Sequence, residues 1–141
     1  MKLEEQIQLL DFPDLGDERG NLVVVEGGSA IPFEIKRIFY IYGSDAEVVR
    51  GCHANLRSEF VMINVSGTSR VRVDNGHESR IIDLDRPRMG LYLKNMLWKE
   101  MYDFSPNSVL LVLSNEHYDP AEYIRDYNDY LKIIRKPGIQ Q

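Results

Sequence analysis

Hydrophobic and polar residues alternate along most of this chain with the period of two that half-buried β-strands show. The clearest case is segment 33–42, in which every second residue is predicted to point inward: Ile35, Arg37, Phe39 and Ile41. Similar short runs, bounded by turn residues, lie at 22–26, 59–67, 69–74, 80–84, 90–95, 97–104 and 108–115. Asp74–Gly76, between two of these runs, predicts a tight hairpin turn. Many short strands at this spacing indicate an all-β protein, either a sandwich or a barrel of antiparallel strands.

The last part of the chain changes to the period of a helix. Asp119 is a suitable N-cap, Pro120 fits the first helical position, and Pro137–Gly138 follows where the pattern stops. The apolar face between them consists of Tyr123, Tyr127, Tyr130, Leu131 and Ile134. The patterns therefore predict one domain over residues 1–141, with strands at about 8–115 and a C-terminal helix at about 120–136.

The composition narrows the class of protein. A length of 141 residues suits a single core, and a net charge of -5 argues against a nucleic-acid partner. Cys52 is the single cysteine, so the chain cannot form an internal disulfide bond and suits a reducing compartment. The acidic N-terminus lacks the apolar core of a signal peptide, and no apolar run reaches the roughly 18 residues of a membrane span. We therefore expect a cytoplasmic protein without a membrane or nucleic-acid partner.

His53 is the histidine with the most distinctive surroundings. Together with Asn55, Glu59 and Gly67 it falls near the first motif of the metal-binding cupins, but Asn55 stands where that motif has its second histidine. The later segment 86–101 contains no histidine, so only His53 and Glu59 remain as ligands. Transition-metal sites generally need three or four protein ligands. We therefore expect no metal, and Glu59 is equally well explained as a carboxylate on the rim of the fold.

Several longer segments carry a more specific resemblance. They run in order from about Asp17 to Leu131 and read DERGNL, IPFEIKRIFYIY, RGCHAN, SEFVMINVSGTSRVRVDNG, MGLYLKNMLWKEMYDFS, VLLVLSNEHYD and EYIRDYNDYL. Together they resemble the nucleotide-sugar 3,4-ketoisomerases, cupin-fold enzymes of deoxysugar biosynthesis that act on dTDP-4-keto-6-deoxyglucose. The resemblance implies a jelly-roll barrel of antiparallel strands with its site inside, no metal or other cofactor, and a homodimer that exchanges an N-terminal strand.

The chain departs from this family at the family's most specific motif. The family usually reads RGxHAHK, whereas this chain has Asn55 in place of the second histidine and Leu56 in place of the lysine. Phe60 replaces a common glutamine, and Lys99 stands where the family often has histidine or arginine. These changes bear on the substrate and the rate rather than on the fold.

A 3,4-ketoisomerase needs a base that removes the C3 proton of the sugar and donors that stabilise the oxygens of an enediol. His53 is the candidate base, because an unperturbed histidine titrates near neutral pH, although an isolated histidine equally fits a core position. Asn55 is expected to share its strand face and to hold a substrate oxygen, because an amide cannot transfer protons at neutral pH. Tyr40, Lys99 or a water molecule is then left to replace the missing histidine.

Arginines are the candidates for binding the pyrophosphate, because a guanidinium grips phosphate oxygens with two hydrogen bonds. Arg50 lies within the specific motif and is the strongest candidate. Arg19 lies in a turn that could reach over the barrel mouth, and Arg37 is predicted to point inward, where it needs an anionic partner. A structural ion pair explains Arg19 and Arg37 equally well.

The segment around Lys99 supplies the remaining candidates for substrate binding. Trp98 is expected either to close one end of the barrel or to pack in the core. Glu100 and Asp103 are predicted near the same wall, where either carboxylate could orient the imidazole of His53. Lys99 itself lies at a position that varies in the family and is a candidate for influencing which C4 epimer forms.

The first hypothesis is therefore a metal-independent ketoisomerase that converts a dTDP-4-keto-6-deoxyhexose to its 3-keto isomer. The second hypothesis is a nucleotide-sugar binding cupin without activity, which the asparagine at position 55 keeps open. The third is an enzyme similar to the 3,5-epimerases, which share the barrel and the ligand.

Overall fold

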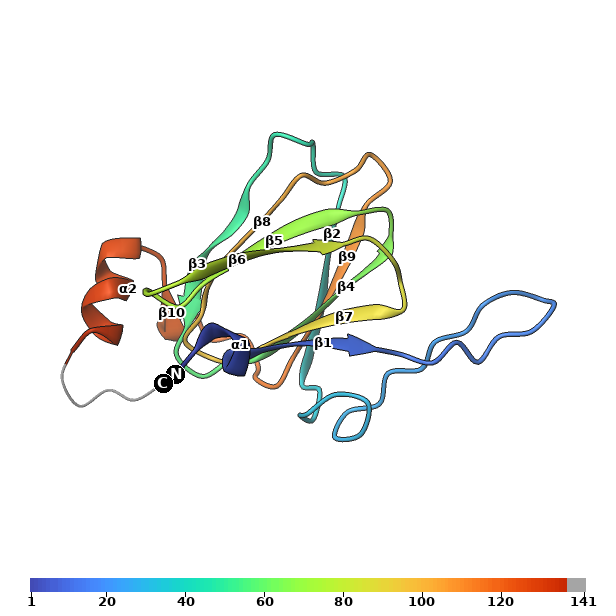
Figure 1. The fold of residues 1–141 in the computed structure, drawn as a ribbon, viewed down its shortest axis with the longest axis horizontal. Coiled ribbons are helices and arrows are strands. Elements are labelled where there is room, and N and C mark those ends of the chain that lie inside the picture. Colours follow the sequence, from blue (N-terminus) through green and yellow to red (C-terminus); the bar gives the residue numbers. More distant parts are fainter. Residues whose placement is uncertain (137–141) are drawn as a thin grey trace.

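Two five-stranded antiparallel sheets enclose the core of the protein in the computed structural model, which describes residues 1–136 (Figure 1). The first sheet contains, in spatial order, β1 (Ile7–Asp11), β7 (Met89–Leu93), β4 (Phe60–Ser66), β9 (Val109–Ser114) and β2 (Arg37–Tyr42). The second contains β10 (Tyr123–Ile124), β3 (Arg50–Asn55), β8 (Trp98–Tyr102), β5 (Ser69–Asp74) and β6 (Ser79–Leu84). Consecutive strands are repeatedly placed in opposite sheets, so the prediction of an antiparallel jelly-roll barrel with a C-terminal helix is confirmed.

The main core lies between the sheets, and the alternation of side chains along the strands builds it. Its buried members include Phe60, Met62, Val71, Val73, Leu91, Leu93, Leu110 and Val112. The predicted faces of segment 33–42 are confirmed within β2, where Ile41 is buried and its neighbours Tyr40 and Tyr42 are exposed. This periodicity is what turns the side chains of four different strands toward one interior.

A second apolar cluster covers the opposite face of the first sheet. Val61, Ile63 and Leu113 point away from the main core and are buried by Phe12, Ile31 and Phe33. These three aromatic and aliphatic side chains belong to segment 12–36, which we call the arm. The arm explains why β4 is apolar on both faces, a pattern typical of a strand that is covered from both sides.

The prediction of a strand at 22–26 is wrong. This segment belongs to the arm and joins neither sheet. Its side chains still alternate, because Val23 and Val25 pack against the second cluster and Leu22 and Val24 are exposed. A backbone hydrogen bond from the N–H of Leu15 to the carbonyl of Leu22 closes a loop that projects beyond the barrel, drawn in blue in Figure 1. The β-branched residues of segment 22–26 favour an extended chain, but no strand within residues 1–136 pairs with this segment, so it is not part of a sheet.

The C-terminal helix is shorter than predicted. Asp119 caps only the 3-10 turn η1 (Pro120–Glu122), and Tyr123 and Ile124 then pair with Asn55 and Ala54 as β10. The helix α2 (Tyr127–Ile134) begins after Asp126, whose side chain accepts a hydrogen bond from the backbone of Asp129. The expectation that Pro137–Gly138 stops the helix falls outside the described residues.

The predicted hairpin turn after β5 is present in a longer form. The turn at Asp74–Gly76 does connect β5 to β6, but the ladder closes at Asp74 and Ser79, so the connection is longer than a two-residue turn. Besides α2, the described chain has the short helix α1 (Leu3–Gln6), and none of its helices has the length and apolar character needed to cross a membrane.

Candidate active site

A cavity of about 190 Å³ lies inside the barrel, between β2 and β4 of the first sheet and β3, β8 and β10 of the second. Its apolar wall is formed by Phe39, Ile41, Phe60, Met62 and Met101. Its polar groups come from Arg50, His53, Lys99 and Tyr123. The mixture of a mostly apolar lining with a few convergent polar groups is typical of a small-molecule site.

A β-bulge in β3 aims His53 into this cavity. Gly51 pairs with Glu100 and His53 pairs with Lys99, so Cys52 is an extra residue that the neighbouring strand does not match. Gly51 and Cys52 both have positive φ, at 84° and 56°, and a Cβ on Gly51 would lie 3.0 Å from the carbonyl oxygen of Lys99. Glycine is therefore required at position 51 by both conformation and space, and the bulge re-aims the following side chain.

His53 is a neutral imidazole at neutral pH. Burial, together with the positive charge of Lys99, lowers its pKa from 6.5 to about 4. The ring lies 4.8 Å from that of Tyr123, measured between centroids, and within residues 1–136 its buried Nδ1 atom makes no hydrogen bond. A neutral imidazole with an uncommitted nitrogen is able to accept a proton from a bound molecule.

Lys99, the partner of His53 on the neighbouring strand β8, is a buried amine that lines the same cavity. Its side chain is only 2% exposed, and Nζ lies 4.9 Å from the ring centroid of Phe60. Burial lowers its pKa to about 7, and the nearby charge of Glu122 opposes this shift. Nζ donates a hydrogen bond of 3.2 Å to Oδ1 of Asn55.

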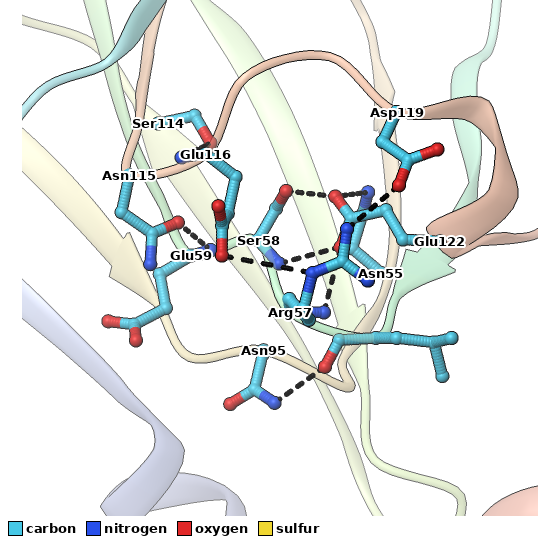
Figure 2. Close-up of polar contacts among 11 residues, drawn as sticks. Asn55, Arg57, Ser58, Glu59, Asn95, Ser114, Asn115, Glu116, Asp119 and Glu122 are labelled. Atoms are coloured by element: carbon cyan, nitrogen blue, oxygen red, sulfur yellow. Dashed lines mark hydrogen bonds and ion pairs between the residues drawn. The ribbon is translucent and has the colours of Figure 1, made fainter.

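Asn55 lies behind Lys99 and is fully buried. Its Nδ2 donates to Oε1 of Glu122 at 3.2 Å, so both ends of the amide are already engaged. Figure 2 shows Asn55, Arg57 and Ser58 converging on the Glu122 carboxylate. The role expected for Asn55, holding a substrate oxygen, thus differs from its observed contacts, which are with the protein.

Glu122 is an ionised carboxylate in the interior. Burial disfavours its charge, but hydrogen bonds from the Ser58 hydroxyl, the backbone N–H groups of Arg57 and Ser58, and Asn55 outweigh that cost and hold its pKa below the usual value. Buried charges persist in proteins when they are hydrogen-bonded in this way. Glu122 is not among the residues predicted for the site, although it begins the EYIRDYNDYL segment that carries the resemblance.

Two residues beside Lys99 lie on the other face of β8, because side chains alternate along a strand. Trp98 packs against Tyr127 and Tyr130 of α2 and donates a hydrogen bond of 2.9 Å to Glu100. Neither residue lines the cavity. Trp98 therefore packs in a buried cluster, which is one of the two roles expected for it, and Glu100 bonds with Trp98 rather than with His53.

Tyr40 and Arg19 also depart from expectation. Tyr40 borders the cavity, but its side chain is 62% exposed and stacks on Tyr42. Arg19 lies in the exposed loop of the arm, where it forms an ion pair of 2.5 Å with Asp17, and it lies outside the cavity lining. Tyr40 therefore lies at the rim of the cavity with its ring mostly exposed, and Arg19 does not reach the cavity.

Arg37 points inward as predicted and lies beside the cavity. Its guanidinium stacks over Phe39 and Tyr118, 5.5 and 5.6 Å from the ring centroids, and donates to the Tyr123 hydroxyl at 3.4 Å. It faces a recess of about 320 Å³ that these aromatic residues line. Within residues 1–136 it forms no ion pair, and its buried Nε and Nη2 atoms lack hydrogen-bond partners.

Glu59, a candidate metal ligand in the sequence, contacts another side chain of the protein. It accepts a hydrogen bond of 2.5 Å from the hydroxyl of Tyr92, which belongs to β7. In the described part of the chain, no three histidine, cysteine, aspartate or glutamate side chains gather where they could hold a metal ion.

The fold and the cavity together define a cupin-type jelly-roll protein with a small-molecule site inside its barrel. The family model described as "WxcM-like, C-terminal" (FdtA) matches residues 5–135. A curated TDP-4-oxo-6-deoxy-alpha-D-glucose-3,4-oxoisomerase of Aneurinibacillus thermoaerophilus is 39% identical over 134 residues, which cover 95% of this chain and 96% of that protein. The chain belongs to this family of nucleotide-sugar 3,4-ketoisomerases, and the predicted resemblance is confirmed.

Solved structures agree with this assignment. A 3,4-ketoisomerase from Helicobacter canadensis is 38% identical, with a TM-score of 0.90, and the match covers 92% of this chain and 98% of the other. The 3,4-ketoisomerase QdtA from Thermoanaerobacterium thermosaccharolyticum, solved as a histidine-to-asparagine variant with TDP-4-keto-6-deoxyglucose, is 37% identical. Its TM-score is 0.91, and the match covers 96% of this chain and 98% of that one.

Proposed function

We propose that this chain is a 3,4-ketoisomerase that converts a TDP-linked 4-keto-6-deoxyhexose to its 3-keto isomer. The observation that carries the proposal is His53, a neutral imidazole with an unpartnered buried nitrogen in the barrel cavity. The reaction needs such a group, because the C3 proton is made acidic by the adjacent ketone and has to be removed near neutral pH. The matched relative and the QdtA structure support the identity of the substrate.

The cationic groups suit the rest of such a substrate. Arg50 lies at the exposed end of β3 and lines the cavity, where it can reach a phosphate of the nucleotide. Arg37 offers two further N–H groups without a partner in residues 1–136. An inward guanidinium with unused donors is stabilised when an anion binds, so Arg37 is the second proposed pyrophosphate contact.

Proton exchange tests this function directly. The protein is incubated with TDP-4-keto-6-deoxyglucose in D₂O, and the C3 and C4 protons are followed by NMR. We expect loss of the C3 proton and formation of a 3-keto sugar, and His53→Asn is expected to abolish both while it retains TDP binding. Binding of the sugar nucleotide without any exchange at C3 would overturn the proposal.

A second candidate function is binding without catalysis. It is favoured by the contacts of Asn55, which occupies the position of the second family histidine. Both ends of its amide are hydrogen-bonded to the protein, to Lys99 and to Glu122. The same NMR experiment separates the two functions, because a binding protein leaves the C3 proton in place. Active wild-type protein therefore excludes this candidate.

We propose in addition that the protein is a homodimer in which the N-terminal segment packs on the partner. β1 and β2 are the two edge strands of the first sheet, and apolar side chains are exposed on them and on the arm: Leu9, Leu22, Val24, Ile38 and Tyr42. Such unpaired apolar edges are typical of an interface. Light scattering during size-exclusion chromatography is expected to give twice the 16.4 kDa mass of one chain, and Val24→Asp is expected to reduce it. A monomeric wild-type mass would contradict this arrangement.

We further propose a cytoplasmic location. The single cysteine, Cys52, carries an exposed thiol, which suits a reducing compartment. Fractionation of cells that express the tagged chain tests this proposal, with recovery outside the cytoplasm as the contrary result.

A further inference from the structure

Lys99 is a buried basic group, and it is not needed for removal of the C3 proton of the sugar, which His53 is proposed to carry out. An ammonium carries three N–H donors, and within residues 1–136 Nζ has a single hydrogen-bond acceptor, Oδ1 of Asn55. The ring of Phe60 covers one side of the nitrogen, and no carboxylate in the described part of the chain forms an ion pair with it. The remaining N–H groups are therefore available to a molecule inside the cavity.

The position of Lys99 relative to His53 places both groups against one bound sugar. The two residues are Cα partners across the β3–β8 ladder, and both side chains line the same cavity. The other titratable or charged groups that face this space are Arg50 from β3, Tyr40 from β2, Tyr123 from β10 and, behind Asn55, Glu122 from η1. Among them, the amine of Lys99 is the group beside His53 that can both give and take a proton near neutral pH.

We propose that Lys99 is the general acid–base partner of His53, and that Asn55 and Glu122 are positioning residues that hold its ammonium group. Lys99 thereby takes over the proton transfer that the histidine absent from position 55 would make. This inference rests on the proposed isomerase function and assigns a second catalytic group to the same site.

The proton and electron movements balance over one turnover. His53 takes the C3 proton, the C3–H electron pair becomes the C3–C4 double bond, and the carbonyl π pair moves to O4, which takes a proton from the Lys99 ammonium. In the second half the neutral amine takes the proton of the O3 hydroxyl, and C3 becomes the ketone. The double-bond pair then takes the proton held by His53 at C4. Both side chains return to their starting states, so no oxidant or reductant is needed.

The buried network explains how an asparagine can support this chemistry. The amide oxygen can only accept a hydrogen bond and the amide nitrogen can only donate, so Glu122 on one side and Lys99 on the other fix the orientation of Asn55. The charge of Glu122 favours the ammonium, while burial favours the neutral amine. The balance places the pKa of Lys99 at about 7, so both forms are populated at the pH where an acid–base group works best.

The test compares Lys99→Arg and Lys99→Ala with a matched control, Lys132→Met, on the exposed face of α2. Arginine keeps the positive charge but cannot release a proton near neutral pH. We expect Lys99→Arg to lower kcat by about 100-fold or more while TDP binding stays within a few-fold of wild type. Addition of small alkylamines is expected to restore part of the activity of Lys99→Ala, and the control should behave as wild type.

The pH profile separates proton transfer from a merely structural role. In the wild type, kcat/KM should fall as pH rises above about 7, because the ammonium is lost, and Lys99→Arg should lack this limb. Glu122→Gln removes the charge that favours the ammonium, so the limb should move to lower pH, and Glu122→Asp should restore it. Wild-type rates with an unchanged profile in Lys99→Arg would refute the role of Lys99 and leave the isomerase function intact. Absence of C3 exchange in the wild type would instead refute the function itself.

Discussion

Asn55 and Glu122 are joined by a hydrogen bond of 3.2 Å although 67 positions separate them in the chain. The bond connects the end of β3 to the 3-10 turn that precedes α2. The same carboxylate accepts the backbone N–H groups of Arg57 and Ser58 at 2.8 and 2.9 Å, so it also fixes the chain where it leaves β3. One buried anion therefore holds together the wall that carries His53 and the segment that carries Tyr123.

Removal of this carboxylate should destabilise the fold. Glu122→Ala leaves several buried donors without an acceptor, and each costs about 1–3 kcal/mol when it cannot reach water. We expect the free energy of unfolding in urea to fall by about 3 kcal/mol or more. Glu116→Ala is the matched control, because Glu116 lies 3.9 Å from Arg57 at the surface and should contribute less than about 1 kcal/mol. Equal effects of the two substitutions would show that the buried network is not a support of the fold.

The depressed pKa of His53 predicts an acid limit for activity. The base has to be neutral, and its pKa is lowered from 6.5 to about 4, so kcat/KM should fall only as pH drops toward 4. The same shift affects stability, because between pH 6.5 and 4 the unfolded chain binds a proton that the folded chain does not. The free energy of unfolding should therefore decline as the pH falls from 6.5 to 4. His53→Asn should decline less steeply in urea titrations over the same pH range, and parallel curves would contradict the assignment.

The bulge that aims His53 should not tolerate a side chain at position 51. Gly51→Ala combines a φ of 84° with a Cβ that approaches the Lys99 carbonyl oxygen to 3.0 Å. We expect a loss of about 1–3 kcal/mol in unfolding free energy and a marked fall in kcat as β3 shifts. Gly43→Ala provides the control, because its φ of 71° is also positive but a Cβ there meets no atom within 4 Å. The control should lose some stability and retain kcat.

Arg37 should matter for ligand binding more than for folding. Its Nε and Nη2 atoms are buried without partners within residues 1–136, so Arg37→Met removes an uncompensated cation and should leave the melting temperature unchanged or raised. TDP affinity measured by calorimetry should fall about 10-fold to 100-fold, the range expected for the loss of a charged hydrogen bond. Arg70→Met is the control, because Arg70 is exposed and pairs with Asp83 and Asp103. Unaltered TDP affinity in Arg37→Met would remove Arg37 from the site.

Local periodicity made much of this fold predictable. The alternation along segment 33–42 gave the inward face of β2 correctly, including Arg37, because neighbouring side chains point to opposite faces of a sheet. The strand at 22–26 and the start of the helix were missed, because pairing partners distant in sequence decided both. Tyr123 and Ile124 fit a helical face, but pairing with β3 makes them a strand.

The site residues that lie in a family motif could be predicted from the sequence. Those whose place depends on strand orientation or on distant contacts could not. His53, Arg50 and Lys99 line the cavity as the RGxHA and LWxEM segments suggested. Trp98 and Glu100 were assigned to the site through their place next to Lys99, although adjacent residues on a strand face opposite ways. Glu122 was missed because its contacts with Asn55 and Ser58 depend on where the chain returns after β9.

The arm has a consequence for how this protein can be shortened or joined to others. By covering Val61, Ile63 and Leu113 it makes the first sheet an inner layer, so a barrel without residues 12–36 presents a water-exposed apolar surface. Versions that lack only residues 12–36 should accumulate as insoluble material even though every residue lining the cavity is present. Fusion partners and purification tags are therefore best attached outside residues 12–36, because this segment covers the apolar face of the first sheet.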